Sequence, residues 1–317
     1  MARRGGRAVT LGQIADIEDG QQEEETVALV NGERAISIDI IKSQGENTID
    51  EDRFTGMAAL RQKSLALTGL FMQLVRTRLH NLYFSGGLDN KTFQSHNKNS
   101  DTNDPKSYSN YESDSLRMGL SGNLFDDLGG GGANSASVQA LRGRLTNMQA
   151  HNLLGAIEPD YNKLNYSLSR QQSLTANHSL YISLSGQHAT QVLDTSEKLY
   201  IGGAQTVRAY PVSELGGERG QLVSGEWRWR LDPTWMLSAF VDYGRVVALP
   251  TSSAETTTAT TLRGHGLSMG WQGPNGISAK LTWAYRDGHN PKPTPSGTDS
   301  DGTLKLDRFW FTTSMVF

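Results

Sequence analysis

The chain of 317 residues contains no cysteine. Disulfides, thiolate zinc sites and thiol catalysis are therefore excluded. The seven histidines are scattered along the sequence and do not show the spacing of a metal site. The net charge of −3 provides no bulk attraction for nucleic acid. We predict neither a bound metal nor a nucleic-acid partner.

The sequence also lacks a long hydrophobic run. The longest candidate, Leu65 to Val75, is interrupted by Thr68, Gly69 and Gln73. A transmembrane helix requires roughly 18 apolar residues. The mean hydropathy of −0.48 is low, but this value is compatible with a transmembrane β-barrel, in which only every second side chain of a strand faces lipid.

No arrangement of side chains points to catalysis. The run Gly129–Gly132 is not followed by a helix start with a lysine, so a hairpin turn is favoured over a phosphate-binding loop. Asp299-Ser300-Asp301-Gly302 resembles a calcium loop but lacks the glutamate at the twelfth position, which favours a solvated loop. Glu226 and Asp242 could face one space, yet nearby arginines favour ion pairing over acid–base chemistry. We predict no enzyme and no cofactor.

From about Arg61 onward, apolar and polar residues alternate with the period of β-strands. Each run places aromatic and aliphatic side chains on one face and polar or charged side chains on the other. The clearest examples of such runs are 82–89, 179–187, 223–231, 277–286 and 308–317. The segment therefore reads as all-β, with about eleven strand candidates of roughly ten residues each, the length of a tilted membrane-spanning strand.

The connections between these runs are short and long in alternation. Leu231–Thr234 and Gln272–Gly276 are short, whereas Asp89–Ser115, Pro250–Thr260 and Asp287–Thr303 are long and polar. This asymmetry is typical of an outer-membrane barrel. A soluble β-sandwich also alternates, but charged residues opposite Trp and Leu on consecutive strands favour a barrel with a wet interior.

Two motifs stand out within the β-rich segment. A Gly-rich stretch leads into Val207-Arg208-Ala209-Tyr210, and Phe240-Val241-Asp242-Tyr243-Gly244 follows about thirty residues later. In an alternating strand, Asp242 shares its face with Phe240 and Gly244. An arginine on a loop and an aspartate on the inner wall of a sheet would satisfy each other where water is scarce.

These motifs, with Glu214–Gly220 and the closing run Phe309–Phe317, resemble the two-partner-secretion outer-membrane transporters, the haemolysin and haemagglutinin secretion proteins of the ShlB, FhaC and HecB types. The resemblance covers residues 56–317 and implies an antiparallel transmembrane β-barrel portion of about eleven of sixteen strands. It implies that the Arg208 loop folds back into the lumen and meets Asp242. The family pattern usually has Gly at the position of Ala209, so we expect strain of about 1–2 kcal/mol if this position requires positive φ.

The resemblance also implies a function. The intact protein would pass an unfolded exoprotein to the cell surface, with outer-membrane lipid and the barrel-assembly machinery as further partners. Inward charges would line the passage, and aromatic residues would form a C-terminal barrel signature. The inward charges are Glu226, Arg228, Arg230, Lys280, Arg286 and Arg308, and the signature residues are Phe309, Phe311 and Phe317.

The sequence departs from the family pattern before the barrel. We expect no signal peptide, plug helix or POTRA domain, although the family would place the protein in the bacterial outer membrane. Two alternatives remain open: a passive porin-like barrel, and a non-functional fused gene fragment.

The first fifty residues resemble a periplasmic segment of resistance-nodulation-division efflux pumps, on Val9–Ala15, Leu29–Ala35 and Gln44–Thr48. Within them, Val27–Val30 and Ala35–Ile41 flank Asn31-Gly32, the preferred pair for a tight two-residue turn. We therefore predict a small α/β or β-hairpin fragment over residues 1–55, followed by the barrel portion over 56–317.

Overall fold

The computed structural model describes residues 3–4, 7–8, 29–30, 33–34, 59–96, 108–149, 157–252 and 254–315. The chain divides into two units, Met1–Asp39 and Ile40–Phe317. In the first unit, β1 (Arg3–Arg4) pairs with β2 (Arg7–Ala8), and β3 (Leu29–Val30) pairs with β4 (Glu33–Arg34). Val30 lies opposite Glu33, as the predicted hairpin requires, whereas Asn31-Gly32 itself lies outside the described residues. The predicted flanks Val27-Ala28 and Ala35–Ile41 lie outside the described residues.

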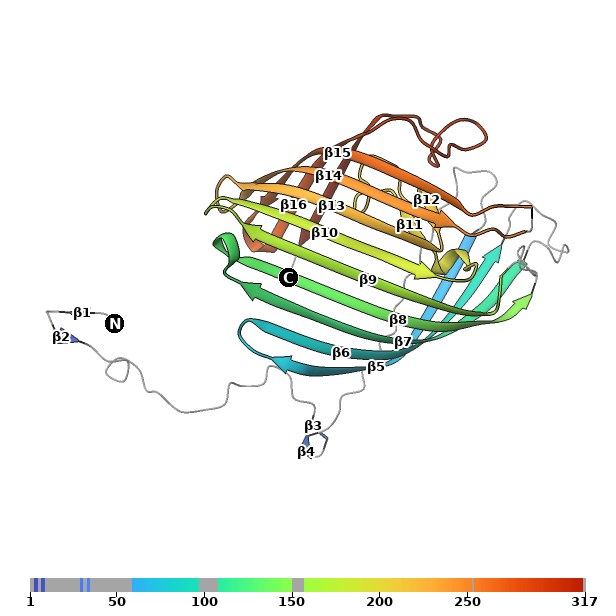
Figure 1. Ribbon diagram of the computed structural model, residues 1–317, viewed down its shortest axis with the longest axis horizontal. Coiled ribbons are helices and arrows are strands. Elements are labelled where there is room, and N and C mark those ends of the chain that lie inside the picture. Colours follow the sequence, from blue (N-terminus) through green and yellow to red (C-terminus); the bar gives the residue numbers. More distant parts are fainter. Residues whose placement is uncertain are drawn as a thin grey trace. The chain divides into compact units, whose positions relative to one another are not determined.

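The second unit is built on a single sheet of eleven antiparallel strands (Figure 1). Its strands, in chain order, are β5 (Ala59–Arg76), β6 (His80–His96), β7 (Tyr108–Asp126), β8 (Gly132–Gln149), β9 (Asp160–Ser173), β10 (His178–Ala189), β13 (Arg219–Arg230), β14 (Trp235–Ala248), β15 (Thr258–Gln272), β16 (Ile277–Arg286) and β17 (Asp307–Met315). Every strand pairs with its sequence neighbour within the sheet, which makes an uninterrupted meander with β5 and β17 at its described edges.

The two faces of the sheet differ as the alternation predicts. On the outward face, Phe311 is 70% exposed, Trp227 45% and Trp229 38%. On the inward face of β16, Thr282 and Ala284 are buried. A β-sandwich would bury the outward aromatic residues between two sheets, so the described strands contradict that alternative and fit the predicted barrel wall.

The connections also follow the predicted asymmetry. Short turns join β5 to β6, β7 to β8, β9 to β10, β13 to β14 and β15 to β16 at one end of the sheet. The β7–β8 turn contains the 3₁₀ turn η3 (Leu128–Gly130), and its glycines Gly129, Gly130 and Gly131 have positive φ. The glycine run is therefore a hairpin turn, as expected. The β15–β16 turn contains η5 (Pro274–Gly276).

Nine of the eleven strands are longer than the predicted ten residues, and β7 reaches 19, whereas β16 has 10 and β17 has 9. Most of the expected loop Asp89–Ser115 continues the β6–β7 ladder, up to His96 opposite Tyr108. Two side-chain contacts hold this extension together: Phe93 stacks on Tyr111, and the Asn90 amide donates to Asp114 at 2.6 Å. The polar composition of the segment marked the end of the apolar band but did not mark the end of backbone pairing.

Between β10 and β13, the chain does not turn directly but inserts residues 190–218, which we call the inserted segment. It contains the 3₁₀ turn η4 (Thr195–Glu197) and a small hairpin of β11 (Leu199–Ile201) with β12 (Leu215–Gly217). Figure 1 shows this hairpin, in yellow, lying against the sheet. Ile201, Val207 and Tyr210 of the segment form a buried core with Phe240, Leu262 and other wall residues.

Candidate functional site: the inserted segment and its wall

The tip of the inserted segment is a tight turn over Val207–Tyr210. The Tyr210 amide donates to the carbonyl of Val207 at 3.2 Å. Gly202 and Gly203, which lead into the turn, both have φ of +107°, a conformation that L side chains rarely adopt. A side chain at Gly202 would also collide with the carbonyl of Pro211. The Gly-rich stretch therefore lets the two arms of the segment approach each other closely.

The turn presents Arg208 to the wall. Its Nε and Nη2 donate to the Asp242 carboxylate at 2.8 and 2.7 Å, and its backbone amide donates to the same carboxylate at 3.1 Å. Nη1 donates to Glu226 at 2.6 Å, and Nη2 also reaches the Ser224 hydroxyl at 3.0 Å. The structure thus contains the Arg208–Asp242 pair that the resemblance implies. Because the pair is bidentate and buried, it fixes both the position and the orientation of the turn.

The spacing of the second motif follows from the shape of the turn. Phe240, Asp242 and Gly244 share the inward face of β14 and are all buried. The Arg208 guanidinium lies 3.4 Å from the centroid of the Phe240 ring, a cation–π contact. A Cβ at Gly244 would lie 2.8 Å from a methyl group of Val207. One strand therefore supplies a stacking surface, a counter-charge and a gap at alternate positions.

Ala209 does not show the expected strain. Ser213 is the only residue other than glycine with positive φ among the described residues, so Ala209 lies in an ordinary backbone region. Its methyl group is buried and packs against Gly264, where an added Cβ would meet it at 2.5 Å. The alanine is accommodated because the facing wall residue is glycine.

The root of the inserted segment is held by two further buried carboxylates. Glu197 pairs with Lys91 at 3.0 Å and with Lys163 at 2.8 Å. The Tyr111 hydroxyl donates to Asp194 at 2.7 Å. Burial raises the pKa of Glu197, but the two lysines outweigh it and leave the pKa below its ordinary value. The segment is therefore anchored to β6, β7 and β9 as well as to β13 and β14.

A second long connection, residues 287–306 between β16 and β17, closes over the segment. Arg286 and Arg308 both donate to Asp299, at 2.8 and 3.1 Å, and Arg308 also pairs with Asp301 at 2.7 Å. Glu214 of the segment accepts hydrogen bonds from the Asn290 amide and from Ser300. The two connections are thus joined side chain to side chain.

This network corrects two expectations. Arg286 is 1% exposed and bound to Asp299, so it does not line an open passage. Asp299 is itself fully buried, whereas the sequence favoured a solvated loop there. The neighbouring Asp301 is exposed; the desolvation of part of its side chain raises its pKa, but hydrogen bonds from Arg308 and Thr303 outweigh this and lower the pKa to about 2.

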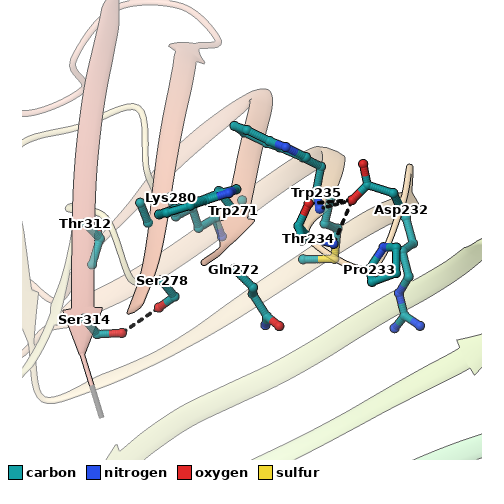
Figure 2. Close-up of a pocket in the computed structure, with 14 residues that line it drawn as sticks. Asp232, Pro233, Thr234, Trp235, Trp271, Gln272, Ser278, Lys280, Thr312 and Ser314 are labelled. Atoms are coloured by element: carbon teal, nitrogen blue, oxygen red, sulfur yellow. Dashed lines mark hydrogen bonds between the residues drawn. The ribbon is translucent and has the colours of Figure 1, made fainter. Parts of the chain in front are cut away.

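The other predicted inward charges lie nearer the short-turn end. Arg228 pairs with Glu226 at 2.8 Å and lies over the Tyr181 ring. Arg230 and Lys280 line a cavity of about 490 Å³ between the β13–β14 and β15–β16 turns. Figure 2 shows residues that line this cavity, among them Lys280, Trp271 and the hydrogen-bonded pair Ser278 and Ser314. The inward face at this end therefore carries cations in contact with open space.

The predicted C-terminal signature lies on the opposite face. Phe309 and Phe311 are exposed on the outward side of β17. Phe317 lies outside the described residues. Trp310, between the two phenylalanines, faces inward and donates its Nε1 hydrogen to the carbonyl of Arg208 at 2.7 Å.

Sequence reasoning missed several residues of this site. Trp310, Glu214, Asp299 and Glu197 contact groups that are far away in the sequence; Trp310 and Arg208 are 102 positions apart. No local spacing signals such contacts. Within the described ranges, no group of three or more acidic or histidine side chains could hold a metal ion. No helix in the described ranges is long and apolar enough to cross a bilayer.

An antiparallel wall with exposed aromatic residues outside, charges inside and a segment folded back against the inner face is the arrangement of an outer-membrane β-barrel transporter. Comparison with known families makes the assignment definite. Residues 108–273 match the model of the haemolysin secretion/activation protein ShlB/FhaC/HecB family. The chain belongs to this family, whose members are protein transporters of the outer membrane rather than enzymes.

Individual relatives agree with this assignment. The heme/hemopexin transporter protein HuxB of Haemophilus influenzae strain 86-028NP is 30% identical over 141 residues, which are 41% of this chain and 24% of HuxB. The chain thus spans about a quarter of the length of the curated relatives it matches.

Two solved structures share the fold. CdiB from Escherichia coli superposes with a TM-score of 0.62 at 18% identity, over 85% of this chain and 48% of that chain. CdiB from Acinetobacter baumannii superposes with a TM-score of 0.58 at 17% identity, over 82% of this chain and 42% of that chain.

Proposed function

We propose that this chain forms part of the wall, together with the folded-back segment, of an outer-membrane transporter that passes an unfolded exoprotein to the cell surface without nucleotide hydrolysis. The observation that carries the proposal is the buried Arg208–Asp242–Glu226 cluster, which fixes a loop segment against the inner wall. A wall that served only to span the membrane would not need such a segment.

The inward cations indicate how the inner surface of the wall would interact with the transported chain. Arg230 and Lys280 face the cavity at the short-turn end, and Arg228 lies between this end and the Arg208 cluster. A hydrated, positively charged surface offers no apolar site on which an unfolded chain could collapse or remain bound. We infer an exoprotein substrate, contact with outer-membrane lipid, insertion by the barrel-assembly machinery, and no catalysis.

Residues 1–55 are proposed to form a separate small unit that resembles the periplasmic pump segment. The pairing of β3 with β4 supports local β-structure there. We place the barrel portion at residues 56–317.

The transport proposal is tested by grafting residues 108–273 into a complete relative of the family. The graft carries Arg208→Ala, Asp242→Ala or, as a matched control, Arg263→Ala. Arg263 lies on β15, opposite Tyr243 on the outward face, so its side chain is on the other side of the wall from the Arg208 side chain. We expect exoprotein release into the medium to fall in the first two variants and to persist in the control.

Exoprotein release that is unchanged in both Arg208→Ala and Asp242→Ala would contradict the proposed role. Ion conductance by the graft in planar bilayers without exoprotein release would favour the passive pore. Failure of the unmutated graft to insert into the outer membrane would favour the non-functional fragment.

A further inference from the structure

The edge strand β17 contacts the inserted segment by two separate routes. Trp310 donates from its indole to the carbonyl of Arg208 at 2.7 Å, at the tip of the segment. Arg308, two residues earlier on the same face, donates to Asp299, whose carboxylate also accepts from Asn290 at 3.0 Å. The Asn290 amide in turn contacts Glu214 of the segment.

β17 needs such support more than the other strands do. It forms an edge of the described sheet, so its backbone is paired on one side only, with β16. Unpaired edges weaken a strand and expose its amides. Phe309 and Phe311 are exposed on the outward face and therefore do not contact the inserted segment.

The two contacts involve different parts of the site. Arg308 binds the connection of residues 287–306. Trp310 instead binds Arg208, whose side chain pairs with Asp242 and Glu226. Arg208 therefore binds β13 and β14 through its side chain and β17 through its backbone. A shift of the turn that breaks the Asp242 pair must also move the carbonyl that Trp310 holds.

We propose that Trp310 is a positioning residue that couples the seating of the inserted segment to the order of the edge strand β17. When Arg208 is seated on Asp242, β17 is held against β16; when the turn leaves, the edge strand loosens. In a transporter whose sheet is completed by further strands, this edge would be the place where the sheet closes. This coupling rests on the proposed function only in that it involves the inserted segment of the transporter, and it can be measured without an exoprotein.

Hydrogen exchange of the full chain in detergent micelles tests the coupling. Trp310→Phe removes the indole N–H and keeps an aromatic ring. We expect amide exchange in β17 to become about tenfold faster, which corresponds to about 1.4 kcal/mol, the order of one hydrogen bond. Trp227→Phe, on the outward face of β13, is the matched control and should leave exchange in β17 unchanged.

The decisive comparison uses Asp242→Asn on β14, which is separated from β17 by β15 and β16. Coupling between two sites is reciprocal. Asp242→Asn should therefore speed exchange in β17 as well as in the segment, while the doubly paired β15 and β16 stay protected. In the Trp310→Phe background, Asp242→Asn should add no further increase in β17.

Exchange in β17 that is indifferent to Asp242→Asn would overturn the coupling, as would strictly additive effects of the two substitutions. The Asp242→Asn arm is informative even if Trp310→Phe does not fold. Because exchange is measured without a substrate, the coupling can fail while the transport proposal stands, and the reverse outcome is equally distinguishable.

Discussion

Arg208 shows why the loop motif requires an arginine. Its three guanidinium nitrogens all donate, to Asp242, Glu226 and Ser224, and its planar face lies on Phe240. A lysine ammonium carries the same charge but has neither the fork geometry nor the flat face. The site therefore distinguishes two residues of equal charge by shape.

We expect Arg208→Lys to release the turn. A lysine cannot reproduce the bonds that the guanidinium donates to Asp242 and Glu226 together, and breaking a buried ion pair costs about 3–5 kcal/mol. Limited proteolysis in micelles should show new cleavage within residues 202–213. Arg228→Lys is the control, because Arg228 is partly exposed and retains a route to solvent. Equal protection of the segment in wild type and Arg208→Lys would show that charge alone suffices.

Gly244 allows a second prediction. A Cβ there would lie 2.8 Å from Val207, 3.0 Å from Ile201 and 3.1 Å from Leu222. Gly244→Ala should therefore displace the segment and cost about 1–3 kcal/mol, as overpacked cores do. At Gly225, on the outward face, the nearest atom to an added Cβ is 3.6 Å away. Gly225→Ala should be neutral, and thermal unfolding of the two variants compares them directly; equal melting temperatures would refute the close fit.

The residues of the motif could be predicted from the sequence, but most of their surroundings could not. Alternation placed Asp242 inward, and the resemblance paired it with Arg208. The contacts of Trp310 and Glu214 depend on how two long connections fold over each other, which no strand period encodes. The condition for strain at Ala209, a positive φ, is not met, and its methyl group packs against Gly264 across the interface; neither fact can be read from the sequence.

At the scale of elements, the sequence predicted the number of strands better than their length. Eleven candidates correspond to the eleven strands of the sheet. Apolar and polar residues alternate only where the two faces of the sheet meet different environments. The alternation is therefore lost where both faces are polar. Backbone pairing continues beyond that point, as in β6 and β7, because the ladder requires no apolar side chains.

The connection between β16 and β17 should loosen in acid. The pKa of Asp301 is lowered from 3.8 to about 2 by hydrogen bonds that outweigh the desolvation of part of its side chain. A lowered folded-state pKa means that the stabilisation is complete above about pH 4 and is lost as the pH falls toward 2. Hydrogen exchange of residues 290–303, corrected for the intrinsic effect of pH, should accelerate over this window. In Asp301→Asn the stabilisation is absent at every pH, so a profile identical to that of the wild type would contradict the assignment.

At the scale of the whole molecule, the tryptophans are unevenly distributed between the two faces of the sheet. The chain has six, and by register five of them face outward: Trp227, Trp229, Trp235, Trp271 and Trp283. Trp235 and Trp271 lie side by side at the short-turn end, with ring centroids 6.3 Å apart. Aromatic residues at the ends of an apolar band are typical of the interface girdles of membrane barrels. Trp310 is the exception, since it faces inward and holds the segment.

This sorting predicts how single tryptophans respond to lipid. Two variants are compared in vesicles, one retaining only Trp227 and the other only Trp310, with the remaining tryptophans changed to phenylalanine. Lipids brominated along their acyl chains should quench the fluorescence of Trp227 strongly, because its ring lies on the outward face at 45% exposure. Trp310 should be quenched little, because the wall separates it from lipid. Equal quenching of the two would mean that the outward face does not contact the bilayer, and the membrane location of this wall would have to be abandoned.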